Sequence, residues 1–301
     1  MKPLFDKNIK ATDPVYINLR DGNQPIQIEE RQCAEDLWAK YHSYADRHFL
    51  VEISKDFDAR FWEMYLACTL MDSGYAISSA DRGPDIGIKR NTKIIWIEAI
   101  TPTGGEPSSH DSVPDLRMRP GFVVAQEVPD RQITLRYCAS IREKYCVKYF
   151  KYVKDGIVSN DDCYVIALNG CRINWSRIDY EPPRIVRSVL PFGWQVVTVD
   201  TASHKIVKRS YQYREYLRKE SGSQVETNIF VKPEYEHISA VMFSNVDVAN
   251  RTPVAGDDFI IVRNPLALKQ LPDGFPKLGR EYWATLSKDK ITLFSKNWTE
   301  S

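Results

Sequence analysis

The 301-residue sequence lacks the short motifs that identify several common enzyme classes. It contains no GxxxxGK phosphate loop, no GxSxG nucleophile turn and no HExxH zinc motif. Its six cysteines include no CxxC pair, which excludes the usual zinc spacings, so we expect free thiols in a reducing compartment. The five histidines are scattered and form no HxH pair, which gives no indication of a histidine metal site.

Long apolar runs and a secretory leader are also missing. No segment approaches the roughly 20 apolar residues of a membrane-spanning helix, and the start MKPLFDKNIKATD has no apolar signal-peptide core. By elimination, we expect a cytoplasmic protein without membrane contact. The formal net charge is only +1, so any affinity for nucleic acid requires a local concentration of positive charge.

The chain does contain a regular succession of helix and strand patterns. Apolar periodicity predicts helices over residues 29–47, 57–75 and 130–154, with Asp58 as N-cap of the second. Strands are predicted over 49–54, 75–80, 83–90, 92–101, 161–170, 193–200, 237–244 and 257–265. Residues 1–28 and 102–121 are predicted to be mainly loops, and 201–235 to be irregular, basic and partly helical.

The order helix, three strands, helix, strand predicts an α/β fold with a mixed central sheet flanked by helices. We divide the chain into an N-terminal helical or irregular extension (1–50), a core (51–200) and a β-containing C-terminal extension (201–301) packed on that core. No composition shift marks a sharp boundary, so the C-terminal strands could instead continue the same sheet.

Three acidic residues occupy positions where apolar residues would be expected. Glu98 shares one face of its predicted strand with Ile94 and Trp96, and Asp85 opens the preceding strand. Glu63 is followed by Leu66, Ala67 and Leu70, its neighbours on the same helix face. An isolated buried carboxylate must be neutralised, paired or bound to a metal. Three of them suit a hard cation such as Mg²⁺, although each alone has an ordinary structural explanation.

Glu63 on the helix, Pro84-Asp85 on the second strand and Glu98 on the third together resemble the PD-(D/E)XK nuclease superfamily, which includes restriction endonucleases. The resemblance covers roughly residues 57–170 and its signature is short. It implies a restriction-endonuclease-like core and metal-dependent hydrolysis of phosphodiester bonds. Asp85, Glu98 and the Ala99 carbonyl would hold Mg²⁺ or, in its place, Mn²⁺, and Glu63 would bind a second ion or orient a metal-bound water.

One departure from the family pattern concerns its lysine. The motif continues Glu-x-Lys, whereas this chain has Glu98-Ala99-Ile100, and isoleucine cannot orient or activate a water molecule. Lys144 on the following helix is the best replacement, and Lys89 in the second strand is the other candidate.

Positive charge gathers on that same helix. Residues 131–154 contain seven Lys and Arg residues and one Glu, a net charge of +6. Such a helix favours sequence-independent contact with phosphates, and its four tyrosines either stack on bases or pack into the core. We assign nucleic-acid binding to Arg136, Ser140, Lys148 and Lys151. A second basic stretch, residues 204–219, could form another wall of a cleft or an exposed arm.

The sequence therefore predicts a Mg²⁺-dependent nuclease acting on DNA, in defence or DNA processing. The alternative is a degenerate nuclease-fold module that binds nucleic acid without cutting it. A scaffold protein would explain the composition but not the buried acids. Dimerisation, which cutting of both strands often requires, has no marker in the sequence and is left open.

Overall fold

The computed structural model describes residues 2–79, 82–90, 93–116, 125–288 and 290–299. Its centre is an eight-stranded mixed sheet in the order β1-β2-β3-β4-β9-β10-β11-β12. The strands are β1 (Ile77–Ser78), β2 (Ile86–Arg90), β3 (Lys93–Ile100), β4 (Cys163–Asn169), β9 (Ala240–Ser244), β10 (Ile260–Arg263), β11 (Arg280–Ser287) and β12 (Lys290–Asn297).

The first three strands form an antiparallel meander, and β4 then pairs parallel to β3. On its other side β4 pairs parallel with β9, which joins the C-terminal strands to the same sheet. The remaining pairs are antiparallel for β9–β10 and β11–β12 and parallel for β10–β11. The C-terminal strands thus continue the sheet, while the predicted domain boundaries at residues 50 and 200 stay predictions.

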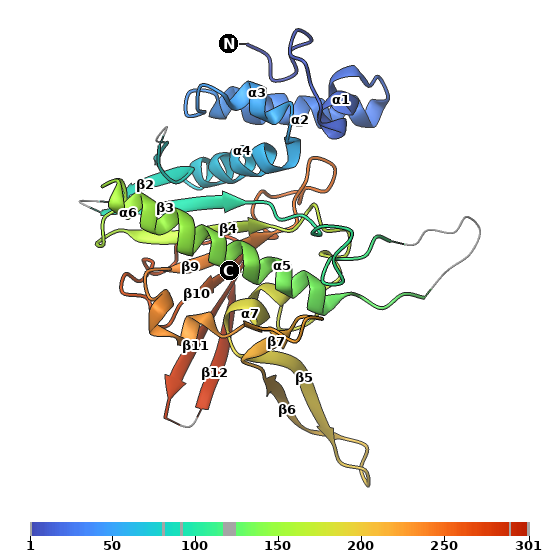
Figure 1. Cartoon of the computed structure of the whole chain (residues 1–301), viewed down its shortest axis with the longest axis vertical. Coiled ribbons are helices and arrows are strands. Elements are labelled where there is room, and N and C mark those ends of the chain that lie inside the picture. The colour runs from blue at the N-terminus through green and yellow to red at the C-terminus, as the bar shows by residue number, and fades with distance from the viewer. Residues whose placement is uncertain (1, 80–81, 91–92, 117–124, 289, 300–301) are drawn as a thin grey trace.

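Helices cover both faces of the sheet (Figure 1). On one face lie α1 (Pro14–Asp21), α2 (Pro25–Tyr41), α3 (Phe49–Ile53) and α4 (Phe57–Asp72). On the other lie α5 (Asp130–Glu143), a π-helical segment (Lys144–Tyr149), α6 (Phe150–Lys154) and α7 (Arg184–Val189). The predicted mixed sheet between helices is confirmed.

Two hydrophobic cores lie on the two sides of the sheet. Along β3, Ile95 and Ile97 pack under α4, whereas Trp96 belongs to the core beneath α5. All seven residues of β4 are buried, as expected for a central strand covered on both faces. Glu98, on β3, therefore lies between the two cores.

Smaller elements lie outside this sandwich. β5 (Phe192–Val199) and β6 (Ile206–Tyr213) form a two-stranded hairpin that projects away from the body (Figure 1). β7 (Tyr216–Arg218) and β8 (Gln224–Glu226) form a second, shorter hairpin. Two 3₁₀ turns follow, over Ile229–Val231 and Pro233–Tyr235.

Several local predictions were wrong, each for a recognisable reason. Residues 49–53 form helix α3 rather than a strand, because Phe49 and Ile53, one turn apart, bury against α2 and α4. Residues 1–28 contain α1, whose start is marked by the cap Asp13 followed by Pro14. Residues 201–235 contain the hairpin strands β6, β7 and β8, and their helical content is limited to short 3₁₀ turns.

The long periodic segments were predicted correctly. Residues 57–72 are helical, but the N-cap of α4 is Asp56, whose side chain accepts from the Ala59 N–H at 3.3 Å, and not Asp58. Residues 130–154 form one helical run interrupted by the π-helical segment. The sequence patterns did not predict strands β11 and β12.

Across the described parts of the chain, none of the helices combines the length and apolar character that a membrane span requires.

Candidate functional site

Asp85 directly precedes β2, and extending the register of β2 and β3 by one step puts it next to Glu98. The last pair at this end of the ladder is Ile86 with Ile97, so the next position along each strand brings these two acids together. The Asp85 carboxylate accepts a hydrogen bond from the Ala99 backbone N–H at 2.7 Å, which holds the acid at the end of the ladder. Two carboxylates therefore meet where β2 begins and β3 ends.

Glu98 is buried, with 2% of its surface exposed. One carboxylate oxygen lies 2.6 Å from Nζ of Lys144, and the other accepts a hydrogen bond from the Tyr152 hydroxyl at 3.1 Å. Burial and the negative charge of Asp85 raise the pKa of Glu98 to about 7, although Lys144 acts in the opposite direction. Lys144 begins the π-helical segment, a kind of distortion that is frequent at functional sites.

Glu63 approaches from the opposite layer. It lies on α4, it is buried, and its two oxygens accept hydrogen bonds from Tyr41 at 2.6 Å and from Arg60 at 2.7 Å. Burial and the charge of Asp85 raise the pKa of Glu63 to about 7, against the attraction of Arg60. Arg60 also contacts Asp46 at 3.4 Å, so it is shared between two acids.

Asp85 is the common neighbour of the two glutamates. Its charge repels both of them, and burial raises its own pKa despite attraction from Lys144, Arg60 and Lys148. Glu63 thus approaches Asp85 from one side of the sheet and Glu98, with Lys144, from the other. Asp85 therefore lies between the two glutamates, each of which has hydrogen-bond partners of its own.

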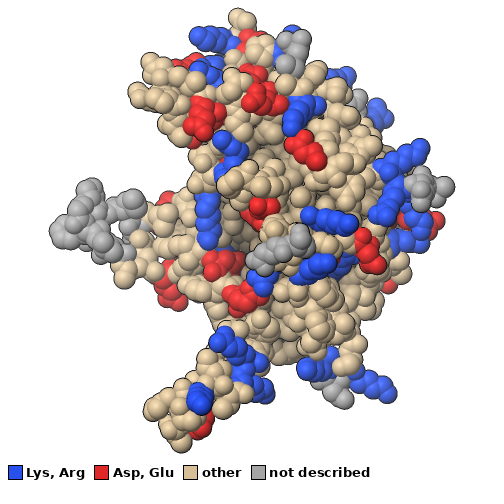
Figure 2. Space-filling view, turned by 180° about the vertical axis from the view of Figure 1, so that it is seen from behind, with Lys and Arg blue, Asp and Glu red and all other residues tan. Residues whose placement is uncertain are grey.

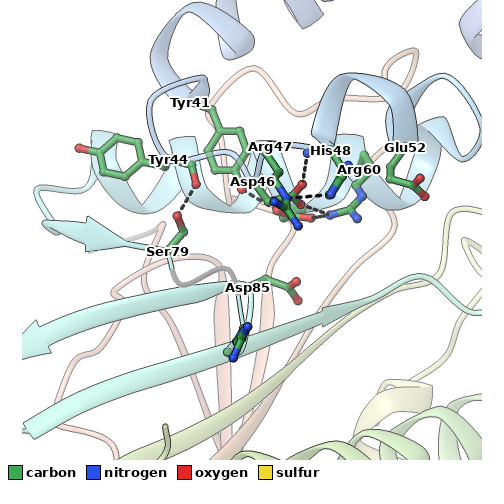
Figure 3. Close-up of a pocket in the computed structure, with 12 residues that line it drawn as sticks. Tyr41, Tyr44, Asp46, Arg47, His48, Glu52, Arg60, Ser79 and Asp85 are labelled. Atoms are coloured by element: carbon green, nitrogen blue, oxygen red, sulfur yellow. Dashed lines mark hydrogen bonds and ion pairs between the residues drawn. The ribbon is translucent and has the colours of Figure 1, made fainter.

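A cavity of about 530 Å³ opens beside Asp85. Its lining includes Glu63 and Arg60 from α4, residues of the α2–α3 connection, and Ser79, Arg82 and Gly83 before β2. Figure 3 shows Asp85 on the strand side of this cavity, facing the helical side that carries Arg60, Arg47 and His48. Glu98 is not part of the lining and lies behind Asp85, against Lys144.

The donor chemistry for a metal ion can be judged from these contacts. In the described ranges, no three His, Cys, Asp or Glu side chains are grouped closely enough to hold one ion. Both oxygens of Glu63 are held by Tyr41 and Arg60, so this acid would have to leave them to become a ligand. Both oxygens of Glu98 are likewise held, by Lys144 and Tyr152. The carboxylates of Asp85 and Glu98 and the Ala99 carbonyl are of the hard oxygen type that Mg²⁺ prefers, and a cation would relieve the repulsion between the two acids.

The two lysine candidates lie in very different places. Lys144 forms an ion pair with Glu98, one of the three acids of the site. Lys89 is exposed and pairs with Ile94. It lies four residues after Asp85 in the sequence, which corresponds to a distance of about 13 Å along an extended strand. Ile100, at the usual motif position, packs against the second core. Lys144 is therefore the lysine that the fold brings to the acids.

The predicted nucleic-acid residues do not share one exposed surface. Ser140 is buried, and Arg136 donates to the Thr103 carbonyl at 2.9 Å. Lys148 is half-buried on the side of Asp85, whereas Lys151 is exposed. The helix's four tyrosines, Tyr137, Tyr145, Tyr149 and Tyr152, are all buried. They pack into the core, the second of the two interpretations, and are not available for base stacking.

Some partners of the acids were not found from the sequence. Arg60 lies three residues before Glu63, a spacing that signals a helix ion pair and could have been noticed. Tyr41 and Tyr152 come from elements 22 and 54 residues away from the acids they contact, and no local signal indicates them.

The charge distribution on the surface is mixed. Figure 2 shows Lys and Arg side chains gathered at mid-height of one face, around a hollow that contains acidic side chains.

Comparisons with family models, with curated proteins and with solved structures find no match to this chain. Its function is therefore inferred from the site itself.

Proposed function

We propose that this protein is a metal-dependent nuclease that hydrolyses phosphodiester bonds in DNA. The observation that carries the proposal is the position of Asp85, directly before β2 and bonded to the Ala99 N–H, beside Glu98 of β3, whose carboxylate lies 2.6 Å from Nζ of Lys144. Two acids and one lysine at the end of a strand pair are the groups that the PD-(D/E)XK resemblance requires, although the lysine comes from another element.

The topology around the site supports the same proposal. Helix α4 precedes the antiparallel meander β1-β2-β3, α5 follows it, and β4 returns parallel to β3. This is the element order predicted for a restriction-endonuclease-like core. Asp85, at this end of the meander, lines a cavity together with Glu63, and the cavity leaves room for a substrate beside these two acids.

Each residue has a role that follows from its position. Asp85, Glu98 and the Ala99 carbonyl would hold Mg²⁺ or Mn²⁺. When bound, the cation would polarise the scissile phosphate and lower the pKa of a water molecule. Lys144, already next to Glu98, would place its positive charge on the attacked phosphate or the attacking water. Glu63, held in orientation by Tyr41 and Arg60, would direct a water molecule toward the phosphate.

The proposal is tested by incubating plasmid and single-stranded DNA with Mg²⁺ or Mn²⁺. We expect Asp85→Asn and Glu98→Gln each to lower the cleavage rate roughly a hundredfold or more, because each removes a charge required at the metal. Lys144→Met should act in the same direction, whereas Lys89→Ala, a matched lysine outside the cluster, should cleave like the wild type. Cleavage that survives both acid substitutions excludes this mechanism.

One observation favours the alternative, a nuclease-fold module that binds nucleic acid without cutting it. Both oxygens of Glu98 are already occupied, by Lys144 and Tyr152. Titration calorimetry with Mg²⁺ and Mn²⁺ separates the two functions. Heat of metal binding that disappears in Asp85→Asn supports the enzyme, whereas salt-sensitive DNA binding without metal binding supports the module.

A further inference from the structure

The β5–β6 hairpin, hereafter the arm (residues 192–213), has little contact with the rest of the molecule beyond its base. It forms a two-stranded sheet of its own, and apart from half-buried Asp200 every residue from 194 to 209 is exposed. In Figure 1 it extends from the end of the molecule opposite the N-terminal helices. It also contains most of the second basic stretch found in the sequence.

The arm carries apolar side chains that a solvated hairpin does not need. Val196, Val197, Val199, Ile206 and Val207 are between 41% and 62% exposed. An isolated two-stranded hairpin is marginally stable in water, and contiguous exposed apolar surface usually marks an interaction site. The exposed apolar side chains of the arm are therefore available for contact with a partner and are not used for packing within the chain.

A groove separates the arm from the β11–β12 hairpin. It has a volume of about 640 Å³, and its walls carry the cations Lys208 and Arg209 on one side and Lys290 on the other. Its described lining residues include no acid, and Ile291 and Leu293 are among its apolar lining. In the described parts of the chain, no ion pair involves these three cations. Figure 2 shows both hairpins projecting from the lower end of the molecule, with Lys and Arg side chains on each.

We propose that the arm and this groove bind the backbone of double-stranded nucleic acid, as a second contact remote from the acidic site. Three unpaired cations in an acid-free groove complement phosphates, and a two-stranded β-ribbon is narrow enough to enter the major groove of B-DNA. A second copy of the chain is a poorer occupant, because it would bring these cations against one another. The inference rests on the proposed function in taking nucleic acid as the partner.

The test is fluorescence anisotropy of a labelled DNA duplex of about 30 base pairs, titrated with the full chain without divalent metal at several salt concentrations. The variant combines Lys208→Ala, Arg209→Ala and Lys290→Ala, all at the surface, where unfolding is not expected. We expect its affinity to fall about tenfold or more at low salt. We also expect the slope of log affinity against log salt to fall in magnitude by about 2 to 3, since each phosphate contact contributes about 0.9.

The control variant removes three lysines near the N-terminus, Lys2, Lys7 and Lys10, which are exposed at the other end of the molecule. It carries the same change in net charge and should bind almost like the wild type. Equal weakening in the two variants, or none in the groove variant, overturns the proposal. A concentration-dependent dimer that the groove substitutions abolish would also overturn it, in favour of a second copy.

Failure of this inference can be told apart from failure of the proposed function. Mg²⁺-dependent cleavage of an oligonucleotide too short to span both contacts should be unchanged in the groove variant. Cleavage with no contribution from the groove refutes the arm contact alone. Salt-sensitive duplex binding through the groove, with no cleavage under any metal, refutes the nuclease and leaves the arm contact standing.

Discussion

At the scale of single residues, the acids of this chain are stabilised by partners from distant parts of the sequence. Glu98 is almost completely buried, and it is held by Lys144, 46 residues away. Removing one partner of such a pair costs about 3 to 5 kcal/mol, because it leaves an uncompensated buried charge. Asp58 shows the opposite situation, since it is half-buried in the first turn of α4 and no described ion pair involves it.

Asp58→Asn should stabilise the protein near neutral pH. Burial, with repulsion from Asp13, Asp247 and Asp56 against attraction from Arg172, raises the pKa of Asp58 to about 6, compared with about 3.9 in an unfolded chain. Between these values the folded state binds more protons than the unfolded state, so the free energy of unfolding falls as pH rises from about 4 to 6. We expect a gain of about 1 kcal/mol at pH 7, because part of the effect is offset by the loss of a negative charge at a helix N-terminus.

The measurement is denaturant unfolding of both proteins from pH 4 to pH 8. The stabilisation should be absent at pH 4 and complete above about pH 7. A variant that is equally stabilised at all pH values, or destabilised at pH 7, would show that the Asp58 carboxylate is not the source of the pH dependence.

At the scale of elements, the start of strand β11 depends on the conformation of the connection that precedes it. The parallel pair β10–β11 is joined by residues 264–279, and the connection ends in Gly279 with φ +54°. A Cβ atom at this position would lie 2.0 Å from the Phe259 carbonyl oxygen, which accepts from the Arg280 N–H at 2.7 Å. The chain passes so close to its neighbour that glycine is required for space as well as for conformation.

Gly279→Ala should destabilise the protein by about 3 kcal/mol or more, because the clash is with backbone and cannot be relieved by a side-chain movement. Gly156→Ala is the matched control, since Gly156 has φ +72° but no atom within 4 Å of an added Cβ. Its cost should be the conformational strain alone, about 1 kcal/mol. Chemical denaturation of the two variants measures the difference, and equal losses would contradict the close approach.

At the scale of the whole molecule, one sheet joins the predicted core to the predicted C-terminal extension. β9 pairs with β4 along five positions, and its residues Ala240 to Phe243 belong alternately to the two cores. The C-terminal strands therefore complete both hydrophobic layers. Stability of the acidic site at the end of β3 depends on strands that come more than 100 residues later.

A chain ending at residue 200 should not fold cooperatively. Removing β9 would expose one edge of β4 and the apolar residues of both cores that pack against it. Circular dichroism during heating should show no sharp transition. The control is a full chain in which a short glycine linker replaces residues 198–207, the exposed end of the arm. This variant should keep a sharp thermal transition. A cooperative transition in the truncated chain would establish residues 1–200 as an independent domain.

The sequence indicated much of the core but little of its surroundings. The helices over 57–72 and 130–154 and the strands β2, β3 and β4 carry strong apolar periodicity, which local sequence alone reveals. Helix α3 was mistaken for a strand because five residues are too few to distinguish the two periods, and only packing against α2 and α4 decided between them. The tyrosines of the basic helix fitted either a core or a binding surface until their burial was known.

By itself, the sequence determined that acids would occupy apolar strand and helix positions, because the alternation of side chains along a strand is a local property. Tertiary structure alone decided which cation each acid would meet, that Asp85 would lie next to Glu98, and that the second basic stretch would become a projecting arm. These depend on register and on contacts between distant segments, and such contacts are fixed only when the whole sheet assembles.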